Sequence, residues 1–296
     1  SSQQRTLGQA KGVFLLGDSH TLNAGLEYQY DYLKSPHRIQ EDVASAYTLA
    51  TYVQDEWNMT DRLNVTFGVR LTGHKEFGLH LSPKVSSMYK VGDCTFRLSY
   101  SMGFKTPTLK ELYDNYITTI GGGKLKHYYG NRDLKPQKSH YVSAGIEYNV
   151  QKLRLMVNGY YNRIRNMIDL IKTETTPEDR LNEVQGSMKY ENLSKARSFG
   201  CDMTMTYHIV RSFSIEGGYS YSNTKAQYTD DPDSKDYMRY LPIDGTAYHR
   251  ATWKAEWDHA WSRYRLAISL FGRYQSLRHY VSDGNAFPHQ LWRLNT

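Results

Sequence analysis

Catalytic chemistry leaves recognisable residue patterns, and the 296-residue sequence lacks the common ones. Its 11 histidines include no His-Glu-x-x-His pair of the catalytic zinc type. No serine lies in a Gly-x-Ser-x-Gly nucleophile turn, and Gly121-Gly122-Gly123 lacks the strand-to-helix context of a phosphate-binding loop. We therefore expect no enzyme activity and no resident metal ion.

The charged residues and cysteines exclude two further kinds of site. Lys and Arg number 37 against 30 Asp and Glu, a formal net charge of +7, but they are scattered, and the densest group is Arg154, Arg163 and Arg165. Nucleic-acid binding normally needs a basic patch, so we expect no nucleic-acid partner. The two cysteines, Cys94 and Cys201, are too few for a disulfide framework or a zinc site.

Apolar residues recur at every second position, which places them on one face of a β-strand. The clearest segment carries Leu63, Val65, Phe67, Val69 and Leu71 on one face. The same alternation occupies residues 22–30, 47–57, 95–104, 142–150, 153–161, 201–209, 213–221, 251–257 and 266–274, with weaker segments near Val13 and Val85. We predict about twelve strands, each near the roughly 9–11 residues that a tilted strand needs to cross a bilayer.

The connections between these strands alternate in length. Short turns are expected at residues 17–20, 58–61, 90–93, 149–151, 210–212 and 259–262. Long polar loops are expected at residues 31–44, 72–81, 105–137, 165–187, 223–245 and 275–290. Alternation without exception is typical of an antiparallel up-and-down barrel with tight periplasmic turns and long outer loops.

The second face of each strand favours a membrane barrel over a soluble sandwich. It is polar and often small, as in Ser214, Gly218 and Ser220, and it carries charges that suit a polar interior: Glu27, Arg70, Arg97, Glu147, Arg154, Glu216 and Lys254. The apolar face ends repeatedly in aromatic residues, as an interface girdle requires. A soluble β-sheet binding or adhesion protein and a passive porin-like channel remain as alternatives.

Several motifs resemble the mid-barrel of TonB-dependent outer-membrane receptors, over roughly residues 45 to 165. They are Tyr52-Val53-Gln54-Asp55-Glu56-Trp57, Thr60-Asp61-Arg62-Leu63, Phe67-Gly68-Val69-Arg70, Leu81-Ser82-Pro83-Lys84, Gly103-Phe104-Lys105-Thr106-Pro107-Thr108-Leu109-Lys110-Glu111-Leu112-Tyr113 and Gly130-Asn131-Arg132-Asp133-Leu134-Lys135-Pro136.

This resemblance implies an all-β transmembrane barrel of about twenty-two strands, filled by an N-terminal plug that engages TonB. We expect residues 1–296 to form a partial β-barrel domain, without the plug and the first and last strands. The resemblance further implies the outer membrane of a Gram-negative bacterium, contact with its lipid, and active uptake of a large nutrient. An iron carrier, haem or a ferric siderophore, is the expected cargo, with cobalamin or a glycan behind it.

Haem receptors of this family resemble one another in two loop boxes with a histidine between them. Here the boxes read Phe104-Lys105-Thr106-Pro107 and Asn131-Arg132-Asp133-Leu134, and His127 lies between them beside Tyr128 and Tyr129. An imidazole is a common axial ligand of haem iron, and aromatic rings can stack on the porphyrin. The candidate ligand-binding residues are therefore Phe104, Pro107, His127, Tyr128, Tyr129, Asn131, Asp133 and Leu134, and the competing interpretation is a solvated loop.

Overall fold

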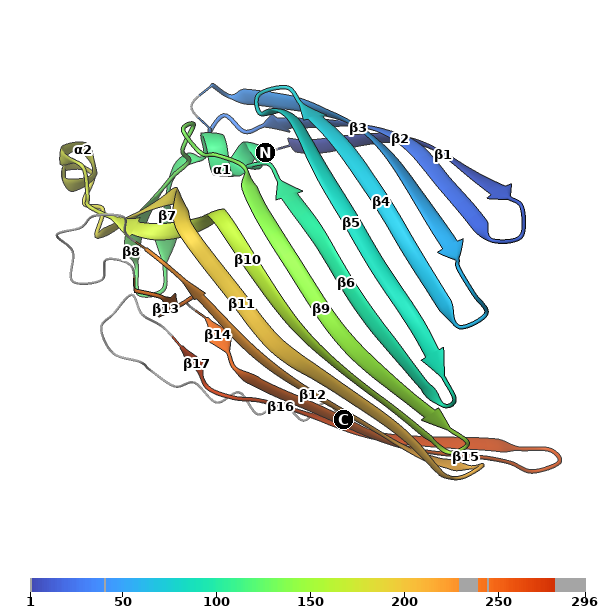
Figure 1. Cartoon of the computed structure of the whole chain (residues 1–296). Helices are drawn as coiled ribbons and strands as arrows, with labels where there is room; N and C mark the ends of the chain where they lie inside the picture. The colour runs from blue at the N-terminus through green and yellow to red at the C-terminus, as the bar shows by residue number, and fades with distance from the viewer. Residues whose placement is uncertain (1, 40, 229–238, 244, 280–296) are drawn as a thin grey trace.

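The computed structural model describes residues 2–39, 41–228, 239–243 and 245–279, almost all of them in β-strands (Figure 1). The elements in chain order are β1 (Ser2–Leu16), β2 (His20–Lys34), β3 (Val43–Asn58), β4 (Leu63–His74), β5 (Gly78–Val91), β6 (Cys94–Lys105), α1 (Leu109–Tyr113), β7 (Asn115–Ile120), β8 (Lys124–Tyr129), β9 (Gln137–Val150), β10 (Leu153–Thr173), α2 (Pro177–Leu181), β11 (Gly186–Val210), β12 (Phe213–Ala226), β13 (Leu241–Pro242), β14 (Thr246–Ala247), β15 (His249–Ala260), β16 (Arg265–Gln275) and β17 (Arg278–His279).

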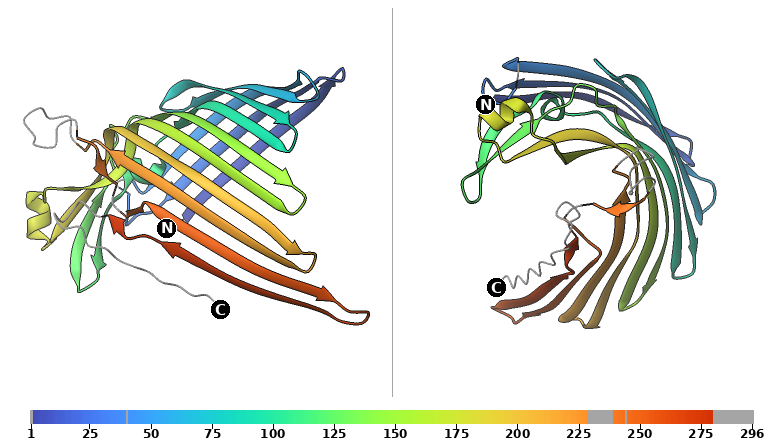
Figure 2. Two further views of the ribbon diagram at one scale, coloured as in Figure 1. Left: turned by 60° about the horizontal axis from the view of Figure 1, so that its bottom comes forward. Right: turned by 90° about the vertical axis from the view of Figure 1, so that its left-hand side faces the viewer.

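Twelve strands form one continuous antiparallel path, in the order β1-β2-β3-β4-β5-β6-β9-β10-β11-β12-β15-β16. Every predicted strand is present, the two weak segments included. The sheet curls into an open arc, with β1 and β16 at its two edges (Figure 2). Among the described residues β1 and β16 do not pair with each other, so the described sheet is open between them.

The apolar face of the sheet lies on the convex side and is not covered by a second layer of the described chain. Along β9, Val142, Ile146 and Tyr148 are exposed, whereas the alternating Ser143 and Glu147 are half-buried. Side chains on a convex surface spread apart, and those on a concave surface crowd together. The apolar residues therefore face outward, which contradicts the sandwich alternative, in which this face would be packed.

The concave face carries ion pairs between neighbouring strands. Arg70 binds Glu27 at 2.8 Å, and Arg97 and Arg154 both bind Glu147, at 3.1 and 2.9 Å. These charges were expected to face a polar interior, and the interior of membrane barrels is polar.

The short turns all lie at one end of the wall, as predicted, but the alternation in loop length has an exception. Residues 72–81 do not form a long loop, because β4 runs on to His74 and β5 starts at Gly78. Backbone pairing continues through this polar stretch, and Gly78 takes the positive φ of 72° that closes the turn. Likewise β10 and β11 shorten the predicted loop 165–187 to residues 174–185. The predicted loops 223–245 and 275–290 fall partly outside the described residues.

Buried apolar side chains gather at the long-loop end, where loops pack on the strands. Three small clusters form this core: Leu33 with Ile39 and Ala44; Leu112 with Leu134 and Ile168; and Leu193 with Ala196 and Ala226. No helix in the described part of the chain is long and apolar enough to cross a membrane. Cys94 and Cys201 are both free thiols.

Candidate functional site

A hairpin from the loop between β6 and β9 crosses the mouth of the arc. This hairpin, β7–β8, lies beside β11, and β8 pairs in parallel with the segment Gly186–Lys189 (Figure 1). β12 pairs with β11 only from Ala196 to Val210, so β8 takes the edge that β12 leaves open. It is the only parallel pairing among the described strands, and it produces a layer in the order β10-β11-β8-β7.

Helix α1 and Gly130 position the two ends of this hairpin, before β7 and after β8. The Thr108 hydroxyl accepts a hydrogen bond from the Glu111 amide, and the Glu111 carboxylate accepts one from the Thr108 amide at 2.7 Å, a complete capping box. At the return, a Cβ on Gly130 would lie 2.7 Å from backbone atoms of Leu112 and Asp114. Only glycine lets the returning chain pass so close to the helix.

Asp179 of α2 joins the hairpin to the loop between β10 and β11. Its side chain is 1% exposed and accepts hydrogen bonds from His127 Nδ1 at 2.5 Å, Tyr129 Oη at 3.0 Å and Ser187 Oγ at 2.7 Å. The Thr176 backbone amide adds a fourth donor at 3.0 Å. Burial raises the pKa of Asp179, but these donors outweigh it and hold the pKa well below its ordinary value. We call this group the Asp179 latch.

His127 itself is held on both sides of its ring. Nδ1 contacts Asp179, and Nε2 lies 2.7 Å from Oδ1 of Asn115, while the ring stacks on Tyr129 at 3.9 Å. Coordination of haem iron would require one of these hydrogen bonds to break. The proposed axial role of His127 therefore stays a prediction, and the contacts seen for this residue hold the loop together.

The other candidate residues lie at the loop end in separate contacts, and most of them pack against the protein. Phe104 stacks on His80 at 3.7 Å, and Tyr128 stacks on Tyr116 at 5.2 Å. Leu134 is buried in the core. Pro107 lines a cavity of about 300 Å³ beside α1.

The second box is likewise built into the loop. Asn131 donates to Glu191 at 3.1 Å and accepts from the Asp133 amide at 3.0 Å, while the Asp133 side chain is exposed. The two boxes thus brace the long loop, and whether they also touch a ligand stays a prediction.

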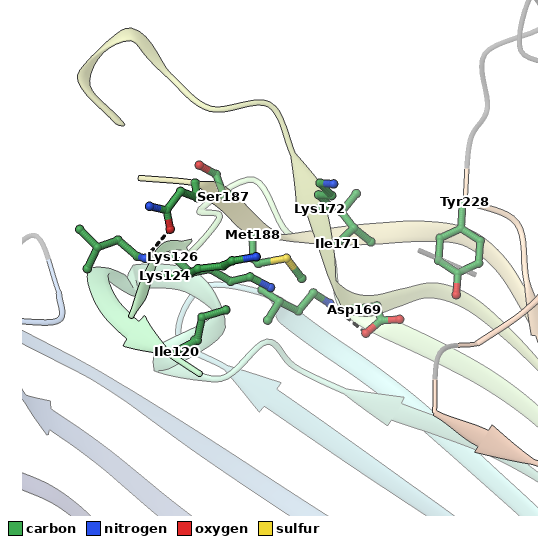
Figure 3. Close-up of a pocket in the computed structure, with 13 residues that line it drawn as sticks. Ile120, Lys124, Lys126, Asp169, Ile171, Lys172, Ser187, Met188 and Tyr228 are labelled. Atoms are coloured by element: carbon green, nitrogen blue, oxygen red, sulfur yellow. Dashed lines mark hydrogen bonds between the residues drawn. The ribbon is translucent and has the colours of Figure 1, made fainter. Parts of the chain in front are cut away.

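A larger cavity of about 850 Å³ lies between the β7–β8 hairpin and the outer parts of β10 and β11 (Figure 3). Three lysines, Lys124, Lys126 and Lys172, line it, and none of them forms an ion pair with a described residue. The remaining lining residues are Ile120, Leu125, Asp169, Leu170, Ile171, Gln185, Gly186, Ser187, Met188 and Tyr228.

Sequence reasoning missed this lysine-lined cavity. Its walls come from segments more than forty residues apart, at residues 120–126 and 169–172. The one local signal is the alternation Lys124-Leu125-Lys126, which is typical of a strand within a segment expected to be a loop. In the described part of the chain, no three His, Cys, Asp or Glu side chains are grouped as metal ligands.

Comparison with known proteins agrees with this architecture. The family described as "TonB dependent receptor-like, beta-barrel" matches residues 1–294. The chain is 26% identical over 213 residues to the iron-regulated outer membrane virulence protein of Vibrio cholerae, covering 70% of this chain and 32% of that protein. It is 24% identical over 252 residues to the ferric enterobactin receptor PirA of Pseudomonas aeruginosa, covering 79% and 31%. The chain thus spans about a third of the length of these curated relatives.

Among solved structures, the chain superimposes on the ferric enterobactin receptor PfeA of P. aeruginosa, in a mutant form bound to enterobactin. The TM-score is 0.72 at 18% identity, over 98% of this chain and 45% of that one. The siderophore receptor PirA of the same species gives a TM-score of 0.69 at 19% identity, over 93% and 49%. At this identity the likeness establishes the barrel fold. The chain belongs to the TonB-dependent receptor β-barrel family, a family of outer-membrane transport receptors of Gram-negative bacteria and not of enzymes.

Proposed function

We propose that this chain forms part of the wall and the cargo mouth of a receptor that takes up an anionic ferric siderophore. The observation that carries the proposal is the lysine-lined cavity at the long-loop end of the barrel. Its volume of about 850 Å³ lies within the roughly 300–1,000 Å³ of small-molecule sites.

The charge of the cavity suits a negatively charged chelate. Ferric complexes of catecholate or carboxylate carriers bear net negative charge, and Lys124, Lys126 and Lys172 supply cations. Apolar side chains such as Ile120 and Ile171 lie among them, and an ionic interaction gains strength where water is partly excluded. The relatives named as ferric enterobactin receptors support a siderophore as the class of cargo.

Haem is the second candidate cargo, since one relative is a hemoglobin and hemoglobin-haptoglobin-binding protein of Haemophilus influenzae, 23% identical over 217 residues. Haem recognition through iron needs an axial ligand such as histidine. None of the described residues that line the large cavity is a histidine, and both ring nitrogens of His127 are held. The described geometry therefore favours a siderophore.

Transport would depend on parts of the receptor beyond the observed arc. We propose that further strands close the wall between β1 and β16 and that a plug fills the lumen, where the Arg70–Glu27 and Arg97–Glu147 pairs would contact it. TonB would act on that plug. A passive channel would need the same barrel without a plug.

Uptake of iron-55 carriers by cells expressing the full receptor tests the cargo. The variant Lys126→Gln/Lys172→Gln should raise the apparent Kd for a ferric catecholate about tenfold or more, since each exposed cation near an anion contributes on the order of 1 kcal/mol. The matched control Lys90→Gln/Lys152→Gln removes two exposed lysines at the short-turn end and should bind normally. Equal affinities in both variants, or uptake of haemin alone, would refute the siderophore proposal.

A further inference from the structure

Basic residues that are scattered in the sequence gather on the convex face of the sheet through strand register. One cross-strand row contains His140, Arg163, Arg197 and Lys225, from β9, β10, β11 and β12. The next row toward the loops contains Lys138, Arg165 and Lys195. Directly paired residues have Cβ atoms about 5 Å apart, so the two rows form one basic patch.

The basic patch lies immediately beyond the apolar band of the same strands. The neighbouring row toward the short turns is Val142, Tyr161 and Phe199, all exposed, and the last apolar row contains Val150, Leu153 and Tyr207. From Leu153 to Tyr161 a strand rises about 27 Å, or about 21 Å in height at a 40° tilt. This is close to the roughly 25 Å apolar band of outer-membrane barrels, so the patch lies at headgroup level.

The described part of the chain does not neutralise these charges. None of Lys138, Arg163, Arg165, Lys195, Arg197 and Lys225 forms an ion pair with a described acidic residue. Arg197 stacks on Tyr240 at 4.2 Å, and its buried Nε has no hydrogen-bond partner among the described residues. Like charges directly opposite each other destabilise a strand pair, and Arg163 faces Arg197. Among the described residues, these cations are therefore available to bind an anion.

The opposite part of the wall has no such patch at the same height. The rows beyond the apolar face of β1, β2 and β3 contain Gln4, Tyr32 and Ser45, followed by Ser2, Lys34 and Val43. Lys34 and the turn residue Lys75 are the basic residues there. The basic patch therefore lies on β9–β12 and has no counterpart on β1–β3.

We propose that the basic patch binds the phosphate groups of lipopolysaccharide in the outer leaflet. Long loops mark the outer side of such barrels, so the headgroups at this level belong to that leaflet. Arginine binds phosphate oxygens in a bidentate geometry, and each basic side chain near an anionic membrane surface strengthens binding roughly fivefold. The exposed Tyr161 and Phe199 rings directly below would contact the acyl chains and fix the depth of the lipid.

Binding of fluorescent lipopolysaccharide to the full receptor in detergent tests the proposal. Lys138→Gln/Lys195→Gln should weaken binding at least tenfold, at roughly fivefold per charge. The control Lys34→Gln/Lys75→Gln removes two lysines at the same height on the other side and should bind like the wild type. A second variant, Arg163→Gln/Arg165→Gln, should lose at least as much affinity, and heat-modifiable gel mobility verifies that each barrel is folded.

Two comparisons separate lipopolysaccharide from other anions. Enzymatically dephosphorylated lipopolysaccharide should bind the wild type as weakly as the phosphorylated form binds Lys138→Gln/Lys195→Gln. Phosphatidylglycerol at equal phosphate concentration should compete poorly. Equal binding of the patch and control variants, equal binding of the dephosphorylated lipid, or full competition by phosphatidylglycerol would each overturn the proposal.

Discussion

At the scale of single residues, Asp179 accepts hydrogen bonds from four described donors at the loop end. A carboxylate with four donors around it is stable only when ionised, because protonation would remove an acceptor from a buried network. The sequence contains no motif that identifies it: its partners His127 and Ser187 lie 52 and 8 residues away.

Replacing Asp179 by asparagine should loosen the β7–β8 hairpin without unfolding the strands. Hydrogen bonds to a charged group contribute roughly 1.5–3 kcal/mol, so we expect β8 amides to exchange at least tenfold faster. Hydrogen exchange with mass spectrometry measures this. Asp133→Asn, an exposed carboxylate in the same loop, should leave the exchange rates unchanged, and equal rates in both variants would contradict the latch.

The lowered pKa of Asp179 also fixes the direction of a pH effect. A group with a folded pKa below its ordinary value of 3.8 contributes stability that is complete above that value and is lost as the pH falls through the folded pKa. Hydrogen-exchange protection of β8 should therefore persist from neutral pH to about pH 5 and decline only in stronger acid. Loss of protection already above pH 5 would contradict this account of the latch.

The contacts of His127 predict that replacing it will not change haem binding, whereas replacement of an axial ligand would abolish the haem absorbance shift. Because both ring nitrogens are already hydrogen-bonded, His127→Ala should leave the absorbance shift of bound haem unchanged while accelerating amide exchange in β8. A lost absorbance shift would support the axial role that the loop boxes suggest.

At the scale of elements, the strands were predictable and the loop layer was not. Alternation identifies a strand where its two faces meet different environments, so all twelve wall strands were recognised from segments such as Leu63 to Leu71. Beyond the band, β10 and β11 continue as a hairpin without strict period-two alternation, and β8 pairs its backbone with residues some 60 positions away. Backbone pairing leaves no pattern of side-chain types, and for this reason the loops were predicted too long.

Close packing of neighbouring strands leaves no room for a side chain at Gly200 of β11. A Cβ at this position would collide with the Tyr221 backbone oxygen of β12 and with the Tyr160 ring of β10. Gly200→Ala should therefore destabilise the barrel by about 2 kcal/mol or more, within the 1–3 kcal/mol typical of overpacking. Gly217→Ala, where a Cβ meets nothing within 4 Å, serves as the control in urea unfolding from detergent micelles. Equal midpoints would refute the packing argument.

At the scale of the whole molecule, the apolar surface faces outward and the buried core is confined to the loop end. Val69, in the middle of the band on β4, is 43% exposed, and its neighbour Gly68 faces the lumen. Val69→Arg should cost about 2–4 kcal/mol of folding free energy in lipid vesicles, and Gly68→Arg much less. A urea titration of folding into vesicles measures both, and equal costs would show that the two faces are misassigned.

Basic residues that are scattered along the sequence are brought together in the folded chain. Lys138, Arg165 and Lys195 lie far apart in the chain, so the basic residues looked scattered and no patch was expected. Antiparallel register sets them in one row. The lysine-lined cavity arises in the same way, from a hairpin and two strands that only the fold brings together.

The parallel pairing of β8 with β11 affects how the cargo specificity of such a receptor can change during evolution. Main-chain hydrogen bonds between Lys126–Tyr129 and Gly186–Lys189, together with the Asp179 latch, position the hairpin without using the side chains of Lys124 and Ile120. Positions such as Lys124 and Ile120 can therefore mutate while their place at the mouth is preserved. Selection for a different cargo can then act on these side chains while the β8–β11 pairing is preserved.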